Sequence, residues 1–208
     1  MSENAVEPGF IHIYLPATRP GRLPLLLLHG TGGDESDLIP LGKHLLPGAA
    51  LLSPRGKVLE SGLPRFFRRL ADGVFDLADL QARTLELDEF IGAACKAYGL
   101  AAPLAVGFSN GANIAASLLL SRPEALAGAI LIRAMLPFEP DSLPDLKAKP
   151  VLLLSGASDP IVPAAKRDRL ATVLAQAGAA FRHEVVAAAH NLTHRDLALA
   201  RDWLEQLQ

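Results

Sequence analysis

The chain has little of what would connect it to disulfide chemistry, a membrane or nucleic acid. Its single cysteine, Cys95, cannot form an internal disulfide bond, and we expect it to be a small core residue of a helix. The longest apolar run, residues 23–28, is too short to span a bilayer. Acidic residues rather than a basic stretch open the chain, so no secretory signal is expected. These absences predict a cytoplasmic protein without a membrane partner.

An excess of positive or negative charge is also lacking. The 20 Lys and Arg residues nearly balance the 22 Asp and Glu residues, and no basic block is longer than a pair such as Arg68-Arg69. A nucleic-acid surface needs clustered positive charge, so nucleic acid is not an expected partner. A small molecule is the better expectation. The oligomeric state stays open, with a homodimer as one alternative.

What is present is enough apolar material for one substantial core. Half of the 208 residues are hydrophobic, which favours a single domain over residues 1–208. Strand-like runs alternate with helix-like stretches, a pattern typical of an α/β fold with a mostly parallel sheet of about seven strands and helices on both faces. The strands are expected at 10–15, 25–28, 49–53, 104–106, 128–133, 150–155 and 181–186.

Helices are expected between most of these strands. Asp34 is a candidate N-cap for a helix that ends near Pro47, and further helices are predicted at 78–98, 164–177 and 192–207, with another starting at Ser109. Two stretches show no clear periodicity, 54–75 and 135–149, and are predicted as long loops. With only short insertions of this kind, the chain is expected to have a minimal lid.

One stretch organises the rest of the sequence. Residues 104–106 form a short apolar strand, Gly107 and Gly111 leave space for a sharp turn, and Ser109 lies at its apex. The pattern Gly-x-Ser-x-Gly between a strand and a helix is a nucleophile elbow, which holds a serine hydroxyl exposed beside a base. The bare pattern arises by chance in roughly one chain in ten of this length, so its context must decide.

The context supplies the partners that such a serine needs. In a parallel sheet, ligands gather at the carboxyl ends of the strands. Asp159 follows the strand at 150–155, and His190 follows the last strand. The order Ser, Asp, His predicts that Ser109 attacks a carbonyl, that His190 takes its proton, and that Asp159 orients the imidazole.

A glycine-rich turn follows the strand at 25–28. We expect the backbone N–H of Thr31 to join that of Asn110 in an oxyanion hole, with small residues such as Gly30 letting the backbone approach the substrate.

Each assignment has a plainer alternative. Ser109 can be a helix N-cap without chemistry, and Asp141 and Asp145 are weaker rivals of Asp159. His194 lies four residues after His190, but a solvated helix residue is the better interpretation. A histidine pair at this spacing can bind a metal, yet no third ligand is apparent in the sequence, so neither a metal nor an organic cofactor is expected.

The motifs together carry a family resemblance. Leu28-His-Gly-Thr-Gly-Gly-Asp34, Gly107-Phe-Ser-Asn-Gly-Ala112, Ser158-Asp-Pro-Ile-Val-Pro163 and Ala189-His-Asn-Leu-Thr193 resemble the α/β-hydrolases of the small serine carboxylesterase, phospholipase and dienelactone-hydrolase-like family. The resemblance covers nearly the whole chain and implies a carboxylesterase-type serine hydrolase. It also implies that His29 holds the oxyanion turn rather than acting as a base. A dienelactone hydrolase proper has cysteine at the elbow, so Ser109 argues against dienelactones as substrates.

The substrate pocket is expected to involve Met135, Ile161 and the aromatic residues of the 54–75 loop. Phe66, Phe67 and Phe75 either line an acyl pocket or anchor that loop to the core. Loop arginines, namely Arg55, Arg65 and Arg133, either steer an acidic substrate or are solvated.

The sequence therefore predicts cleavage of small carboxylic esters or thioesters through an acyl-enzyme. Two alternatives stay open: a noncatalytic small-molecule-binding protein with the α/β-hydrolase fold, and a peptidase.

Overall fold

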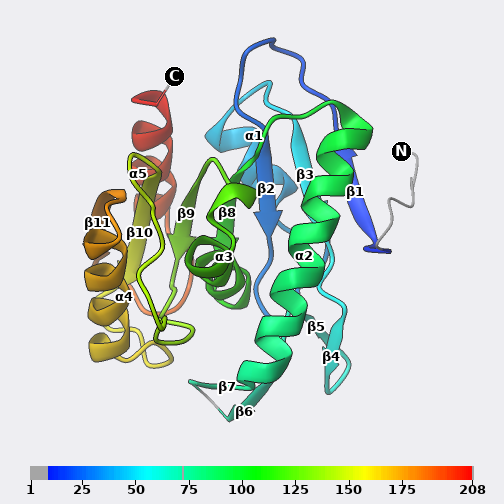
Figure 1. The fold of residues 1–208 in the computed structure, drawn as a ribbon. Coiled ribbons are helices and arrows are strands. Elements are labelled where there is room, and N and C mark those ends of the chain that lie inside the picture. Colours follow the sequence, from blue (N-terminus) through cyan, green and yellow to red (C-terminus); the bar gives the residue numbers. More distant parts are fainter. Residues whose placement is uncertain (1–8, 72, 208) are drawn as a thin grey trace.

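A computed structural model describes residues 9–71 and 73–207. Its centre is a seven-stranded sheet in the order β1-β3-β2-β8-β9-β10-β11 (Figure 1). Six strands are parallel, and β1 pairs antiparallel with β3 at one edge. The predicted α/β sheet of about seven strands is confirmed. The strands of this sheet are β1 (His12–Leu15), β2 (Leu25–Leu28), β3 (Leu51–Pro54), β8 (Leu104–Phe108), β9 (Gly128–Ile132), β10 (Pro150–Gly156) and β11 (Ala180–Val186).

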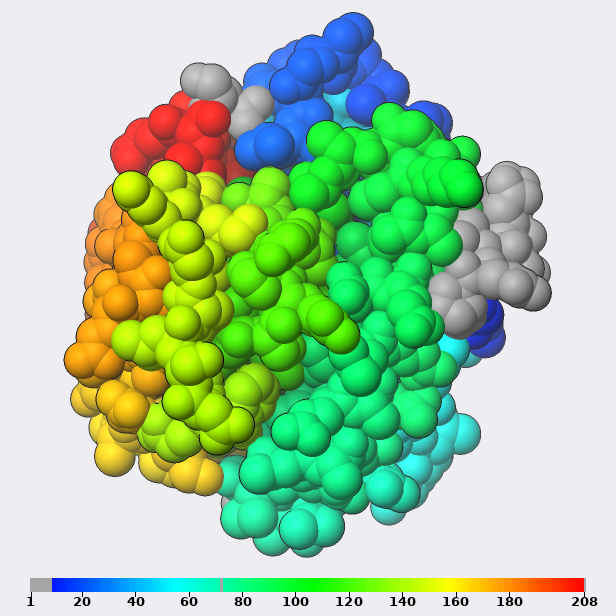
Figure 2. Space-filling model, in the orientation of Figure 1, coloured from blue at the N-terminus to red at the C-terminus, as the bar shows by residue number. Residues whose placement is uncertain are grey.

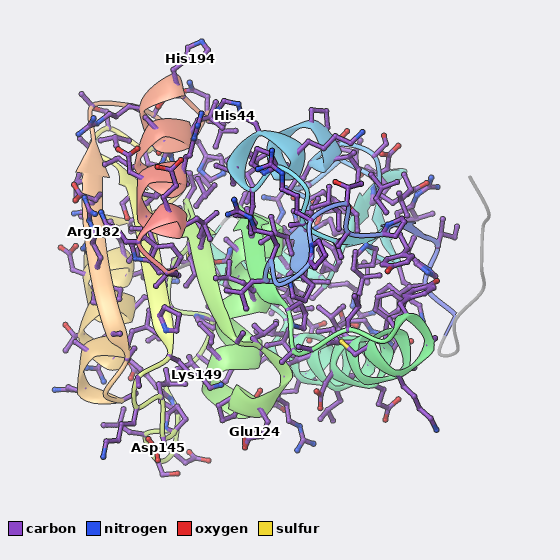
Figure 3. All side chains as sticks on the ribbon, turned by 90° about the horizontal axis from the view of Figure 1, so that it is seen from above. His44, Glu124, Asp145, Lys149, Arg182 and His194 are labelled. Carbon is purple, nitrogen blue, oxygen red and sulfur yellow. The ribbon has the colours of Figure 1, made fainter. Side chains whose placement is uncertain are left out.

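Helices cover both faces of the sheet. Seen from above, α1 and α5 lie on one side, and α2, α3 and α4 lie on the other (Figure 3). In the space-filling view, α4 and the chain that precedes β10 cover the sheet beside α3 (Figure 2). The helices are α1 (Ile39–Leu45), α2 (Leu77–Tyr98), α3 (Asn110–Ser121), α4 (Ala164–Gln176) and α5 (His194–Glu205), with a short 3₁₀ helix, η1 (Pro123–Ala125).

The leucine run of β2 shows why the central strands are continuously apolar. Leu26 and Leu28 pack into the core beneath α2 and α3, whereas Leu25 and Leu27 pack into the core beneath α1 and α5. Side chains alternate between the faces of a strand, so a strand covered on both sides must be apolar at every position. All four leucines are fully buried.

The segment at 54–75, predicted as a long loop, instead contains two small hairpins. Strands β4 (Val58–Glu60) and β5 (Leu63–Arg65) form the first, and β6 (Arg69–Ala71) and β7 (Val74–Phe75) form the second. These strands are too short and too exposed to show an alternating pattern. Both hairpins lie at the lower end of the molecule in Figure 1, the end toward which β2 points.

Helix α1 begins later than predicted. Asp34 does not cap it; its Oδ1 accepts hydrogen bonds from the N–H and the hydroxyl of Ser36, which closes a local turn. The helix starts at Ile39, with Pro40 in its first turn. A helix that started at Asp34 would place Pro40 in its interior, where proline blocks a backbone hydrogen bond.

No helix of the described residues is long and apolar enough to cross a membrane.

Candidate active site

Ser109 lies at a strained turn between β8 and α3. Its φ is 53° and its ψ is −113°, a conformation that non-glycine residues rarely adopt. It occupies the N-cap position of α3, but its side chain makes no capping hydrogen bond. The Ser109 hydroxyl therefore does not cap the helix and points to another partner.

The two glycines of the elbow are required by close packing. A Cβ atom at Gly107 would lie 2.7 Å from the backbone of Ala112. At Gly111, a Cβ atom would collide with the carbonyl group of Leu28 at the end of β2. Gly107 therefore lets the first turn of α3 pack against β8, and Gly111 lets it pack against the end of β2.

His190 links Ser109 to Asp159. Its Nδ1 lies 2.8 Å from Asp159 Oδ2, and its Nε2 lies 2.8 Å from Ser109 Oγ. A carboxylate only accepts hydrogen bonds, so Nδ1 donates to it; in the neutral ring, Nε2 then accepts from the serine hydroxyl. The structure therefore brings together the three side chains that the sequence singled out, 31 and 81 residues apart along the chain.

The carboxylate of Asp159 is fixed at both oxygens. Oδ1 accepts from the backbone N–H groups of Ile161 and Val162, at 2.8 and 3.1 Å, while Oδ2 faces His190. Only 2% of the Asp159 side chain is exposed. The turn after β10 thus leaves one oxygen free to hold the imidazole in a single orientation.

The backbone strain at Ser109 leads to a stability prediction. We expect Ser109→Gly to be more stable than Ser109→Ala by about 1 kcal/mol, because glycine tolerates a positive φ and alanine does not. Urea unfolding of the two variants measures the difference.

Gly92 provides the matched control for this comparison. It lies in the helical backbone of α2, and a Cβ atom there would meet nothing within 4 Å. Gly92→Ala should therefore raise the free energy of unfolding by about 1 kcal/mol. An alanine at 109 as stable as the glycine would show that the turn is not strained.

A cavity of about 300 Å³ opens above Ser109. Both Met135 and Ile161 line it, as expected, and so do the oxyanion candidates Thr31 and Asn110. The complete lining consists of Thr31, Arg65, Arg69, Gly73, Phe75, Phe108, Ser109, Asn110, Asn113, Arg133, Met135, Ile161, Val162 and His190. Sequence reasoning did not assign Phe108 or Val162 to the cavity, although both lie inside the motifs that carry the family resemblance.

The structure corrects the expectation for Phe66 and Phe67. Neither ring lines the cavity; they are 2% and 0% exposed and belong to the core beneath α2 and α3. The backbone N–H of Phe66 donates to Asn110 Oδ1 at 2.7 Å, which ties the first hairpin to the elbow. Phe75 is the aromatic residue of this segment that reaches the cavity.

His29 holds the turn that carries Thr31. Its Nδ1 lies 2.6 Å from the carbonyl oxygen of Gly30, and its Nε2 accepts from the backbone N–H of Gly56 at 2.9 Å. Burial lowers the pKa of His29, which favours the neutral ring that this pair of bonds requires. A Cβ atom at Gly30 would lie 2.8 Å from the ring of Phe108, so this glycine serves packing within the protein.

The three arginines considered from sequence have different environments. Arg55 pairs with Glu35, and Arg65 lines the cavity while donating to Thr31 Oγ1 at 2.7 Å. Arg133 is not solvated: its side chain is completely buried. Sequence reasoning missed this because its partner lies 63 residues further along the chain.

His194 is an exposed residue of the first turn of α5. Figure 3 shows it projecting from the face of the sheet that α1 and α5 cover, on the same side as His44. Among the described residues, no group of three or more His, Cys, Asp and Glu side chains is arranged to hold a metal ion.

Comparison with known proteins finds relatives over nearly the whole chain. A family model described as phospholipase/carboxylesterase matches residues 69–208. The putative hydrolase MhqD of Bacillus subtilis (strain 168) is 44% identical over 197 residues, which cover 94% of this chain and 98% of that protein.

Solved structures agree with this match. The Bacillus cereus carboxylesterase superposes with a TM-score of 0.93 at 42% identity, over 96% of this chain and 95% of that one. The structure of YahD with malic acid superposes with a TM-score of 0.90 at 28% identity, over 94% of this chain and 98% of that one.

Proposed function

Because the chain belongs to the phospholipase/carboxylesterase family of α/β-hydrolases, we propose that it cleaves small carboxylic esters or thioesters through an acyl-enzyme on Ser109. The observation that carries the proposal is the pair of 2.8 Å hydrogen bonds of His190, one to Ser109 Oγ and one to Asp159 Oδ2. This chain of bonds is the arrangement that activates a serine.

In the proposed reaction, Ser109 Oγ attacks the ester carbonyl while His190 Nε2 takes the hydroxyl proton. The tetrahedral intermediate collapses, and the imidazolium returns the proton to the departing alcohol or thiol. A water molecule then attacks the acyl-enzyme with His190 again as the base, which releases the acid and regenerates Ser109. Asp159 keeps the proton of the neutral imidazole on Nδ1 and stabilises the imidazolium.

The oxyanion of the intermediate requires donors beside Ser109. We assign this role to the backbone N–H groups of Thr31 and Asn110, two residues that line the cavity together with Ser109. Asn110 is the first residue of α3, and N–H groups in the first turn of a helix have no partner within the helix. Each such donor stabilises the transition state by about 3 kcal/mol.

The size of the cavity supports small substrates. About 300 Å³ is at the lower end of the range for small-molecule sites. A second, mostly apolar hollow of about 440 Å³ shares Gly73 and Phe75 with it and continues toward Leu136 and Phe138. Long acyl chains would need this second hollow, whereas short ones fit the first.

We therefore expect hydrolysis of p-nitrophenyl esters to be fastest with short acyl chains. The measurement is kcat/KM over esters of graded chain length. Best activity on palmitate-length esters would refute this preference and would show that the second hollow binds the acyl chain.

Covalent labelling separates this function from a noncatalytic binding protein. A fluorophosphonate should form an adduct with Ser109 in the folded protein, because the reagent needs a serine activated by a base. Intact mass before and after reaction, followed by peptide mapping, identifies the site. If folded protein stays unlabelled, the binding-protein alternative holds instead.

A further inference from the structure

Arg133 directly follows β9 and has no role in the chemistry described above, yet its side chain is completely buried. Its φ is 59°, in the left-handed region that favours glycine. A long cationic side chain at a strained, buried position is unfavourable unless its bonds compensate. The bonds of its guanidinium group show what it holds.

All five N–H groups of the guanidinium have acceptors. Nη1 and Nη2 donate to Oδ1 and Oδ2 of Asp196, at 2.9 and 2.8 Å, in a two-pronged ion pair. Nε donates to the carbonyl oxygen of Ala189 at 3.0 Å, and Nη2 also donates to that of Asn191 at 2.9 Å. The fifth bond joins Nη1 to Leu154 O at 3.3 Å.

Two of these acceptors are the carbonyl groups of the residues before and after His190. Arginine is rigid and planar, so bonds to Ala189 and Asn191 from one guanidinium fix the spacing and direction of both peptide groups. The residue between them has little freedom left in its backbone. This constraint acts on the side chain that must face Ser109 and Asp159 at once.

Asp196, the partner of Arg133, also organises the end of the same loop. Its Oδ2 accepts from the backbone N–H and the hydroxyl of Thr193, and the Thr193 hydroxyl in turn caps the start of α5. The Asp196 side chain is 0% exposed. The pair therefore joins β9, the His190 loop and the first turn of α5 into one unit.

The same short segment after β9 is bonded to the elbow. The backbone N–H of Ser109 donates to Ile132 O at 2.9 Å, and the N–H of Met135 donates to Asn113 Oδ1 at 2.9 Å. Arg133 thus lies between Ile132, which is bonded to Ser109, and Met135, which is bonded to α3. Its own side chain fixes the loop that carries His190.

We propose that Arg133, together with Asp196, is a positioning residue that sets the distance between His190 and Ser109. The inference rests on the proposed function, because it concerns the same serine and histidine. Because its guanidinium is completely buried, Arg133 acts through the backbone on either side of His190 rather than on the substrate.

Two variants test the proposal. Arg133→Lys keeps the charge but has three donors for five acceptor oxygens, so at least two of these bonds are lost, and its ammonium group lacks the planar fork that bonds both sides of His190 at once. Arg133→Met combined with Asp196→Asn removes both charges, which avoids leaving one buried charge unpaired. In both we expect kcat for a short p-nitrophenyl ester to fall roughly 100-fold with KM within about threefold of wild type.

A second readout follows the imidazole itself. The proton shared by His190 Nδ1 and Asp159 should give a low-field NMR resonance in the wild type, and this resonance should broaden or shift in both variants. A merely structural role would lower stability without moving either this resonance or kcat of the folded enzyme.

Two controls accompany the variants. Arg201→Lys changes an exposed arginine of α5 that pairs with Glu205, and it should leave kcat unchanged. Leu170→Ala removes a buried core side chain of α4 and should lower stability while the folded enzyme keeps its kcat. If Leu170→Ala lowers kcat as much as Arg133→Lys does, the effect is one of stability and the proposal is overturned.

The outcomes distinguish a failure of the positioning role from a failure of the proposed function. If the wild type is active and a folded Arg133 variant has the same kcat, only the positioning role is overturned. A wild type that neither hydrolyses esters nor labels at Ser109 removes the proposed function and this inference with it. If both Arg133 variants fail to fold, the Arg133 Nε–H resonance of the wild type should shift when a fluorophosphonate occupies Ser109, and an unmoved resonance overturns the proposal.

Discussion

Ser109→Ala is expected to lower kcat for ester hydrolysis by on the order of 10⁴-fold or more, because alanine has no hydroxyl to attack the carbonyl. The 2.8 Å bond from Ser109 Oγ to His190 Nε2 is lost, whereas the elbow backbone has the same requirement for a positive φ in both proteins. The measurement is steady-state hydrolysis of a short p-nitrophenyl ester, with circular dichroism to show that the variant is folded.

Ser121→Ala is the matched control, since Ser121 ends the same helix and donates only to Ser117 O. It should hydrolyse esters at the wild-type rate. Activity of Ser109→Ala within tenfold of wild type would mean that the nucleophile is a different residue.

Asp159→Asn is expected to lower kcat about 10⁴-fold, although it replaces only one heavy atom of the side chain. In the wild type, Oδ1 accepts from two backbone N–H groups, those of Ile161 and Val162. The amide oxygen of asparagine must take this place, because an NH₂ group there would face two donors. The NH₂ group then faces His190 Nδ1, where it donates.

A donor at this position forces the wrong tautomer on His190. Nδ1 becomes an acceptor, the ring proton moves to Nε2, and Nε2 can no longer accept the proton of Ser109. We expect KM to stay within a few-fold of wild type and fluorophosphonate labelling to slow in parallel with kcat.

The control for this variant is Asp145→Asn. Asp145 lies on the exposed loop before β10, where its Oδ1 accepts from the N–H of Lys147, and it was a rival of Asp159 from sequence alone (Figure 3). It should behave as wild type. Equal losses in the two aspartate variants would contradict the tautomer argument.

These residues were predictable from sequence because each lies within four residues of the end of a strand. Ser109 follows β8, Asp159 lies three residues beyond β10, and His190 lies four residues beyond β11. The strands themselves were readable because burial on both faces leaves a continuous apolar run. Periodicity and strand order together were therefore sufficient to nominate the three side chains, although not to show their distances.

Other features could not be read in this way because their causes are not local. Phe66 and Phe67 looked like pocket residues, since aromatic side chains in an irregular stretch often are; a hairpin instead turns them into the core. Arg133 looked like an ordinary loop arginine, because nothing near it in the sequence announces a buried carboxylate. Its partner, Asp196, resembles any first-turn acid of a helix.

The position of β11 at the edge of the sheet affects when activity can arise during folding. Seven residue pairs join β11 to β10, and the loop after β11 carries His190. During synthesis, β11 and the loop that carries His190 are made after the other six strands of the sheet. A chain that has built the sheet only as far as β10 already holds Ser109 in its elbow but has no base beside it. We therefore expect hydrolysis to appear only when the edge strand docks, so that the onset of turnover during refolding marks the completion of the sheet.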